Sequence, residues 1–153
     1  MKLPTTSLAL LPLLVSSAAA ISKITVAGHM SITDDEWGND EHATRDHEFL
    51  PYTIGEPASN HATLAWTEGM GGEVRIEVTC TMTYLLASDA VRFNCNAKLY
   101  EGTSESSNDL DGQVNVVKTV GRNRNEDIEI KVRNTDEGGD HAEIRLHVTN
   151  RKL

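Results

Sequence analysis

The sequence predicts an all-β fold, an antiparallel β-sandwich of about eight strands. Apolar and polar residues alternate with a period of two through most of the chain after residue 20, and no segment keeps a helical period. Clusters of Gly, Asp, Asn, Ser and Pro separate the alternating stretches, as turns do in antiparallel sheets. Strands with one apolar and one polar face favour two sheets packed face to face. A small β-barrel is the main alternative.

Each predicted strand places a set of apolar side chains on one face. In the first half of the chain these sets are Ile24, Val26, Met30 and Ile32; Leu50, Tyr52 and Ile54 in a strand near residues 43–54; Ala62, Leu64 and Trp66; and Val74, Ile76, Val78, Cys80, Met82 and Tyr84. In the second half they are Val91, Phe93, Cys95, Ala97 and Leu99; Val114, Val116 and Val120; Ile128, Ile130 and Val132; and Ala142, Ile144, Leu146 and Val148. Between them, turn residues such as Gly71-Gly72 and Gly138-Gly139 mark reversals of the chain.

The two cysteines fall opposite each other in this reading. If residues 85–90 form a turn, antiparallel partners have numbers that sum to 175, so Cys80 faces Cys95. Both cysteines also lie on the apolar face of their strands. Directly opposed residues in a non-hydrogen-bonded pair come close enough to bridge. We therefore predict a Cys80–Cys95 disulfide, which should stabilise the fold by about 3 kcal/mol.

The first twenty residues have the features of an export signal. Lys2 is followed by an apolar run over residues 8–15 and by small residues from Ser16 to Ala20. The run is too short, and too interrupted by proline, to span a bilayer, which needs roughly 20 apolar residues. We expect residues 1–20 to be a signal peptide and residues 21–153 to form a single domain, secreted and extracellular.

The net negative charge limits the kinds of molecule that we expect this protein to bind. The chain carries 14 Lys and Arg against 23 Asp and Glu, and its formal net charge of −9 becomes −10 when Lys2 is removed with the signal. Nucleic acids and anionic membranes attract positive surfaces, so neither is an expected partner. An extracellular protein or a glycan is expected instead.

The acids gather at one end if the strands run strictly up and down. Under that assumption the first, third, fifth and seventh connections share an end, and these connections contain no Lys or Arg. They hold thirteen of the 23 acids: Asp34, Asp35, Glu36, Asp40, Glu41, Glu68, Glu101, Glu105, Asp109, Asp111, Asp136, Glu137 and Asp140. The opposite connections are mildly basic, with Arg122 and Arg124. A missed strand would invert this assignment for every connection after it.

Crowded carboxylates repel one another, and this repulsion favours the binding of a cation. Ca²⁺ is the natural candidate outside the cell, because it takes six to eight oxygen ligands. The candidate ligands are Asp34, Asp35, Glu36, Asp40, Asn108, Asp109, Asp111, Asp136, Glu137 and Asp140. Their spacing does not match the twelve-residue EF-hand loop. The competing interpretation is that Asp, Asn and Gly stand here because tight turns prefer them, with the carboxylates separately solvated.

No catalytic motif is present: the sequence has no Gly-x-Ser-x-Gly, His-Glu-x-x-His or Cys-x-x-Cys. We therefore predict a secreted, non-enzymatic binding module with an acidic loop end. Trp37 lies inside an acidic loop and is either a ligand contact or a lid over the core. A small hydrolase that uses a carboxylate pair, and a metal-free structural protein or inhibitor, are the alternatives.

Overall fold

The computed structural model describes residues 21–35, 40–56, 59–104, 108–136 and 139–153, and in these ranges it contains strands and no helix. The all-β prediction is confirmed. The nine strands are β1 (Ile21–Asp34), β2 (Glu41–Glu48), β3 (Tyr52–Gly55), β4 (His61–Met70), β5 (Val74–Leu85), β6 (Ala90–Glu101), β7 (Asp109–Gly121), β8 (Asn125–Arg133) and β9 (His141–Lys152).

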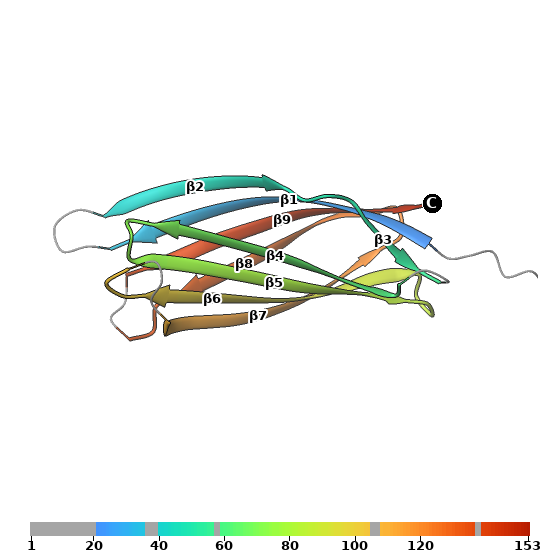
Figure 1. The fold of residues 1–153 in the computed structure, drawn as a ribbon. Coiled ribbons are helices and arrows are strands. Elements are labelled where there is room, and N and C mark those ends of the chain that lie inside the picture. Colours follow the sequence, from blue (N-terminus) through green and yellow to red (C-terminus); the bar gives the residue numbers. More distant parts are fainter. Residues whose placement is uncertain (1–20, 36–39, 57–58, 105–107, 137–138) are drawn as a thin grey trace, which may run out of the picture.

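The strands form two antiparallel sheets that pack face to face (Figure 1). Sheet A has the order β2-β1-β9-β8, and β3 also pairs with β1. Sheet B has the order β4-β5-β6-β7. Neither sheet closes on itself, so the sandwich prediction is correct and the barrel alternative is wrong.

The core lies between the sheets and contains nearly all of the predicted apolar positions. Phe93, Met30, Ile76 and Ile130 are among its large, fully buried side chains. Trp66 packs closely over Gly28, where a Cβ atom would come within 2.6 Å of the indole Cζ3. The period-two pattern therefore identified the inward faces, because one face of each strand must leave water.

The predicted strand near residues 43–54 is two strands. β2 and β3 both pair with β1, but the residue numbers of paired positions sum to 75 for β2 and to 76 for β3. One extra residue is therefore accommodated between Glu48 and Tyr52, where Pro51 has no N–H to donate to the ladder. Leu50 lies in this interruption and is 85% exposed, so its predicted place on the apolar face is wrong.

This extra strand does not change which end each connection occupies. β2 and β3 follow the same edge of β1 in the same direction, so the chain still travels from one end of the sandwich to the other. The up-and-down order predicted for the eight longer segments is therefore retained. The strand ends that flank the four acidic connections lie at the end away from the C-terminus in Figure 1.

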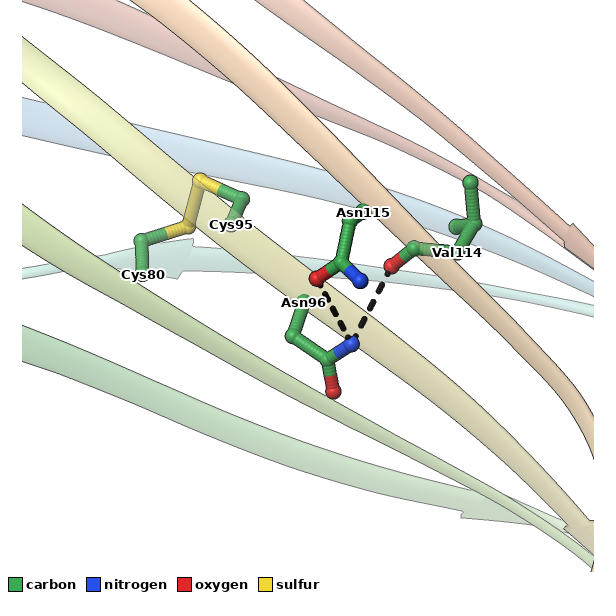
Figure 2. Close-up of a disulfide and its surroundings, with 5 residues drawn as sticks. All are labelled: Cys80, Cys95, Asn96, Val114 and Asn115. Carbon is green, nitrogen blue, oxygen red and sulfur yellow. Dashed lines mark hydrogen bonds between the residues drawn. A yellow bond between two sulfur atoms is a disulfide. The ribbon is translucent and has the colours of Figure 1, made fainter.

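The predicted Cys80–Cys95 disulfide is present. The two residues are directly paired on β5 and β6, and their Cα atoms are 3.9 Å apart. The observed register sums to 175 throughout the β5–β6 ladder, as predicted. Next to Cys95 on β6, the Asn96 side-chain amide donates to Asn115 Oδ1 (2.9 Å) and to the Val114 carbonyl, and so ties β6 to β7 on the outer face of sheet B (Figure 2).

The two long sides of the sandwich differ in how closely the edge strands of the two sheets approach each other. On one side β7 and β8 approach so closely that a Cβ atom at Gly112 would overlap the backbone carbonyl of Arg133. Lys118 and Glu126 form an ion pair (3.3 Å) across the same side. On the other side β2 extends past the core, and none of its eight residues is buried. One side is therefore closed, and the other leaves a strand largely exposed.

Candidate functional site

The four acidic connections converge on one another through specific contacts. A side chain at Gly71, in the β4–β5 turn, would meet Asp34 Oδ2 at 2.7 Å. The Asp35 amide, in the β1–β2 connection, donates to Asp140 Oδ1 (2.7 Å) in the β8–β9 connection. The β8–β9 and β6–β7 connections are linked by the Thr135 amide, which donates to the Asp111 carbonyl (2.8 Å). The four segments therefore form one continuous surface.

We call this surface the acidic end and define it by its described polar residues. They are Asp34, Asp35, Asp40, Glu101, Asn108, Asp109, Asp111, Asn134, Asp136 and Asp140. Glu36, Glu137 and Trp37, which the sequence nominated as two ligands and a contact residue, lie outside the described residues. The remaining eight predicted metal ligands are all at the acidic end, which also includes Glu101 and Asn134.

Burial divides the acidic end into a base and a rim. Asp34, Asn134 and Asp140 are buried, at 4%, 7% and 5% exposure. Glu101 and Asp111 are half-buried, whereas Asp35, Asp40, Asn108, Asp109 and Asp136 are exposed. Two of these buried side chains accept hydrogen bonds from backbone amides of the rim: Asp140 from Asp35, and Asn134 from Asp136 (2.8 Å).

Glu101 is half-buried and contacts three other residues of the acidic end, although the sequence analysis did not nominate it as a ligand. The Asn134 side-chain amide donates to Glu101 Oε2, and the Glu101 backbone amide donates to Asp111 Oδ2 (2.8 Å). The carboxyl of Glu101 also shares a hydrogen bond with Asp140. Two carboxyl groups can share such a bond only while one of them keeps its proton.

The pKa of Glu101 reflects this arrangement. The hydrogen bond to Asp140, followed by burial and by the negative charge of Asp140, raises the pKa of Glu101 to about 7. The pKa of Asp35 is also raised, first by its hydrogen bond to Asp40 and then by the charge of the same carboxylate. Both shifts have the negative charge of a neighbouring carboxylate among their causes, and a cation bound at this end would relieve that repulsion.

A shallow hollow of about 240 Å³ opens among these groups. Its lining consists of Glu101, Gly102, Asp109, Asp111 and Asp136. Four of these five residues carry carboxyl groups, and none has an aromatic ring. Even so, no three His, Cys, Asp or Glu residues within the described ranges are arranged so that they could hold a metal ion.

The opposite end of the sandwich is basic, as the sequence predicted. Arg122 forms an ion pair with Asp89 (2.5 Å), which also accepts a hydrogen bond from the Tyr84 hydroxyl (2.7 Å). Arg151 donates to Asn125 Oδ1 (2.8 Å), and the Lys152 amide donates to Asn123 Oδ1. These contacts join the β5–β6 and β7–β8 turns to the C-terminal strand. Arg122, Arg151 and Lys152 thus lie at the end opposite the acidic connections.

Comparisons with known proteins return no relative: no protein-family model, no curated protein and no solved structure matches the chain. Within the described residues, no helix is long and apolar enough to cross a membrane. The fold and the acidic end therefore define an antiparallel β-sandwich with a carboxylate-rich end.

Proposed function

We propose that this protein is a secreted, non-enzymatic binding module whose acidic end holds a basic segment of an extracellular protein. The observation that supports the proposal is the hollow at the acidic end, where four of the five lining residues carry carboxyl groups. The raised pKa of Glu101, about 7, agrees with such crowding. Arg and Lys side chains of a partner would neutralise these carboxylates through charge-assisted hydrogen bonds, which are among the stronger ones in proteins.

The arrangement of the carboxylates favours side-chain cations over a single metal ion. Within the described ranges, no three His, Cys, Asp or Glu residues are placed so that they could hold one metal ion, although the exposed acids of the end come from three connections. Long, flexible basic side chains can reach separated carboxylates one by one, and guanidinium groups bind them in a bidentate manner. A calcium ion instead needs six to eight oxygens around one point.

Calcium is a second candidate, because four carboxylates line the hollow beside Glu101. Backbone carbonyls and water would have to supply the remaining ligands in that case. Bound calcium and a bound basic peptide would both lower the net negative charge of this end. Titration calorimetry distinguishes the two candidates, because one predicts heat of binding on addition of a basic peptide and the other on addition of calcium.

The test is titration calorimetry of residues 21–153 with a nona-arginine peptide and, separately, with CaCl₂. The test variant is Asp109→Asn/Asp136→Asn, at the rim of the hollow. The matched control is Asp127→Asn/Glu129→Gln, which removes two charges from the outer face of sheet A. We expect nona-arginine binding that the rim variant weakens about tenfold and the control leaves within about twofold.

Three results would contradict the basic-segment proposal. One is no binding of nona-arginine by the wild-type chain, and another is equal weakening by both variants, which would indicate a diffuse charge effect. Calcium binding that a chelator reverses and the rim variant abolishes, in the absence of peptide binding, would assign the end to the metal. Hydrolysis of a glycan that Glu101→Gln eliminates would overturn the non-enzymatic assignment itself.

A further inference from the structure

The outer face of sheet A carries many of its charges in opposed pairs. Four basic side chains lie directly opposite a carboxylate on the neighbouring strand and contact it. The pairs are His29–Asp46 (2.7 Å), His147–Asp127 (2.7 Å), Lys131–Glu143 (2.7 Å) and Arg145–Glu129 (3.6 Å). Opposite charges at directly opposed positions stabilise an antiparallel pair of strands. The positive charge of these side chains is therefore compensated within the face.

The row of this face nearest the C-terminus breaks the pattern. Lys23 on β1 and Arg151 on β9 are directly paired, and both side chains are exposed. Like charges at opposed positions repel each other and are destabilising. Among the described residues, neither side chain forms an ion pair with a carboxylate. The fold therefore holds two uncompensated positive charges side by side.

Arg151 is held in place by neutral groups. Its Nη1 donates to the carbonyls of Arg124 (3.4 Å) and Asn150 (3.2 Å), and its Nη2 donates to Asn125 Oδ1 (2.8 Å). Hydrogen bonds to neutral oxygens orient a guanidinium without cancelling its charge. A guanidinium has five N–H donors, so these three bonds leave donors for a ligand. Arg151 is therefore an oriented cation that can still bind an anion.

Two further cations flank this pair. Arg124, in the β7–β8 turn, and Lys152, at the end of β9, are exposed, and neither is ion-paired with a carboxylate of the described chain. The start of β1, the end of β9 and the β7–β8 turn lie together at one end of the sandwich (Figure 1). We call Lys23, Arg124, Arg151 and Lys152 the basic patch.

The acids near this end do not neutralise the basic patch. Asp89 is paired with Arg122, and Asp127 with His147. Glu56, which follows β3, forms no ion pair with the patch within the part of the chain that the structure describes. A local group of like charges sets the potential near it, even on a molecule of opposite net charge. The chain therefore offers a site for an anion at the end opposite its acidic end.

We propose that the basic patch binds a sulfated polysaccharide. Arg side chains bind oxyanions through paired hydrogen bonds, and Lys side chains add point charges. The Cα atoms of directly opposed residues lie about 5 Å apart, so the ligand has to bring two anionic groups close together to meet Lys23 and Arg151. Sulfate groups at neighbouring positions of a sugar chain meet this requirement. A polysaccharide with one carboxylate on every second sugar does not.

An anionic membrane fits the basic patch less well than a narrow polysaccharide chain. A membrane is a broad plane, and on a chain with a formal net charge of −9 it would also approach acids around the patch, such as Glu56 and Asp127. The strongly anionic leaflet of a cell membrane also faces the cytoplasm, whereas we expect residues 21–153 outside the cell. A narrow chain can contact the four cations alone.

The test is titration calorimetry of residues 21–153 with a heparin decasaccharide at about 0.15 M NaCl, with the chemically desulfated decasaccharide as the ligand control. The test variant is Lys23→Gln/Arg151→Gln. The matched control, Lys131→Gln/Arg145→Gln, removes the same charge from another part of the same face. We expect heparin binding that the patch variant weakens at least about tenfold and the control leaves within about twofold. The patch variant should also lose part of the salt dependence of binding, because fewer cations contact the ligand.

Matching thermal unfolding midpoints would show that the variants are folded. The proposal is overturned if the wild-type chain does not bind heparin, if both variants weaken binding equally, or if the desulfated chain binds as well. Binding to phosphatidylserine vesicles in the absence of heparin binding would assign the patch to a lipid surface and also overturn it. Asp109→Asn/Asp136→Asn should keep heparin binding within about twofold, so a failure at one end of the sandwich is distinguishable from a failure at the other.

Discussion

Glu101 and Asp140 are held together by groups that cannot easily move apart. Asp140 is buried and accepts a hydrogen bond from the Asp35 amide, while Glu101 is bonded to Asn134 and, through its backbone, to Asp111. Because the neighbours hold both carboxyls in place, the hydrogen bond to Asp140, together with burial and the charge of Asp140, favours the protonated form of Glu101. This explains why the pKa of Glu101 is raised to about 7.

The raised pKa predicts how stability changes with pH. The folded-state pKa of Glu101, about 7, lies above its ordinary value of 4.5, so the folded state binds the proton more tightly than the unfolded state does. The resulting stabilisation is complete below pH 4.5 and is lost as the pH rises through 7. Allowing for solvent screening at this half-buried group, we expect a loss of about 1–2 kcal/mol.

Glu101→Gln should remove most of this pH dependence, since an amide does not ionise. Urea unfolding between pH 5 and pH 8 would measure the free energy of unfolding of both proteins. Glu129→Gln, on the outer face of sheet A, is the control and should keep the wild-type slope. An unchanged slope in Glu101→Gln would contradict the shared-proton account.

At the scale of elements, β5 and β6 form the centre of sheet B and are the strands that the disulfide joins. Cys80 and Cys95 are both completely buried and face the core. The bridge closes a short loop, with a sequence separation of 15, and limits the freedom of the unfolded chain. The covalent link and the hydrogen-bonded ladder therefore reinforce the same pair of strands.

The variant Cys80→Ala/Cys95→Ala should lower the free energy of unfolding by about 3 kcal/mol. Urea unfolding at pH 7 would measure the loss, and wild-type protein in reductant should show a similar one. A change below about 1 kcal/mol would show that the neighbouring ladder alone holds the two strands together.

The elements also show what alternation in a sequence can and cannot reveal. The register of β5 and β6 was predictable because a short turn fixes which residues face each other. The split between β2 and β3 was missed because Leu50 continued an apparent apolar series, although Pro51 indicated an interruption. The Glu101–Asp140 pair was not predictable as a pair, because it joins two loops far apart in sequence through tertiary packing.

At the scale of the whole molecule, the four connections at one end of the strands hold thirteen of the 23 acids and no Lys or Arg. The placement of the acidic connections at one end was predictable from an up-and-down order of strands, since each connection then alternates between ends. Which of those acids would be buried was not, because burial depends on how the four connections pack together. Asp140 and Asp136 lie four residues apart, yet only Asp140 is buried.

This crowding predicts a response to salt. Added NaCl screens repulsion among the acids, so urea unfolding at pH 8 should show a free energy of unfolding that increases by an amount on the order of 1 kcal/mol between low salt and 0.15 M. The exposed ion pairs of the outer face, such as Lys131–Glu143, contribute little and should not reverse the trend. A decrease in stability with salt would contradict the prediction.

The same separation of charge makes a single copy an electric dipole directed along its strands. In the field of a positively charged surface, such a molecule turns before contact and arrives with its acidic end first, with the strands standing upright on the surface.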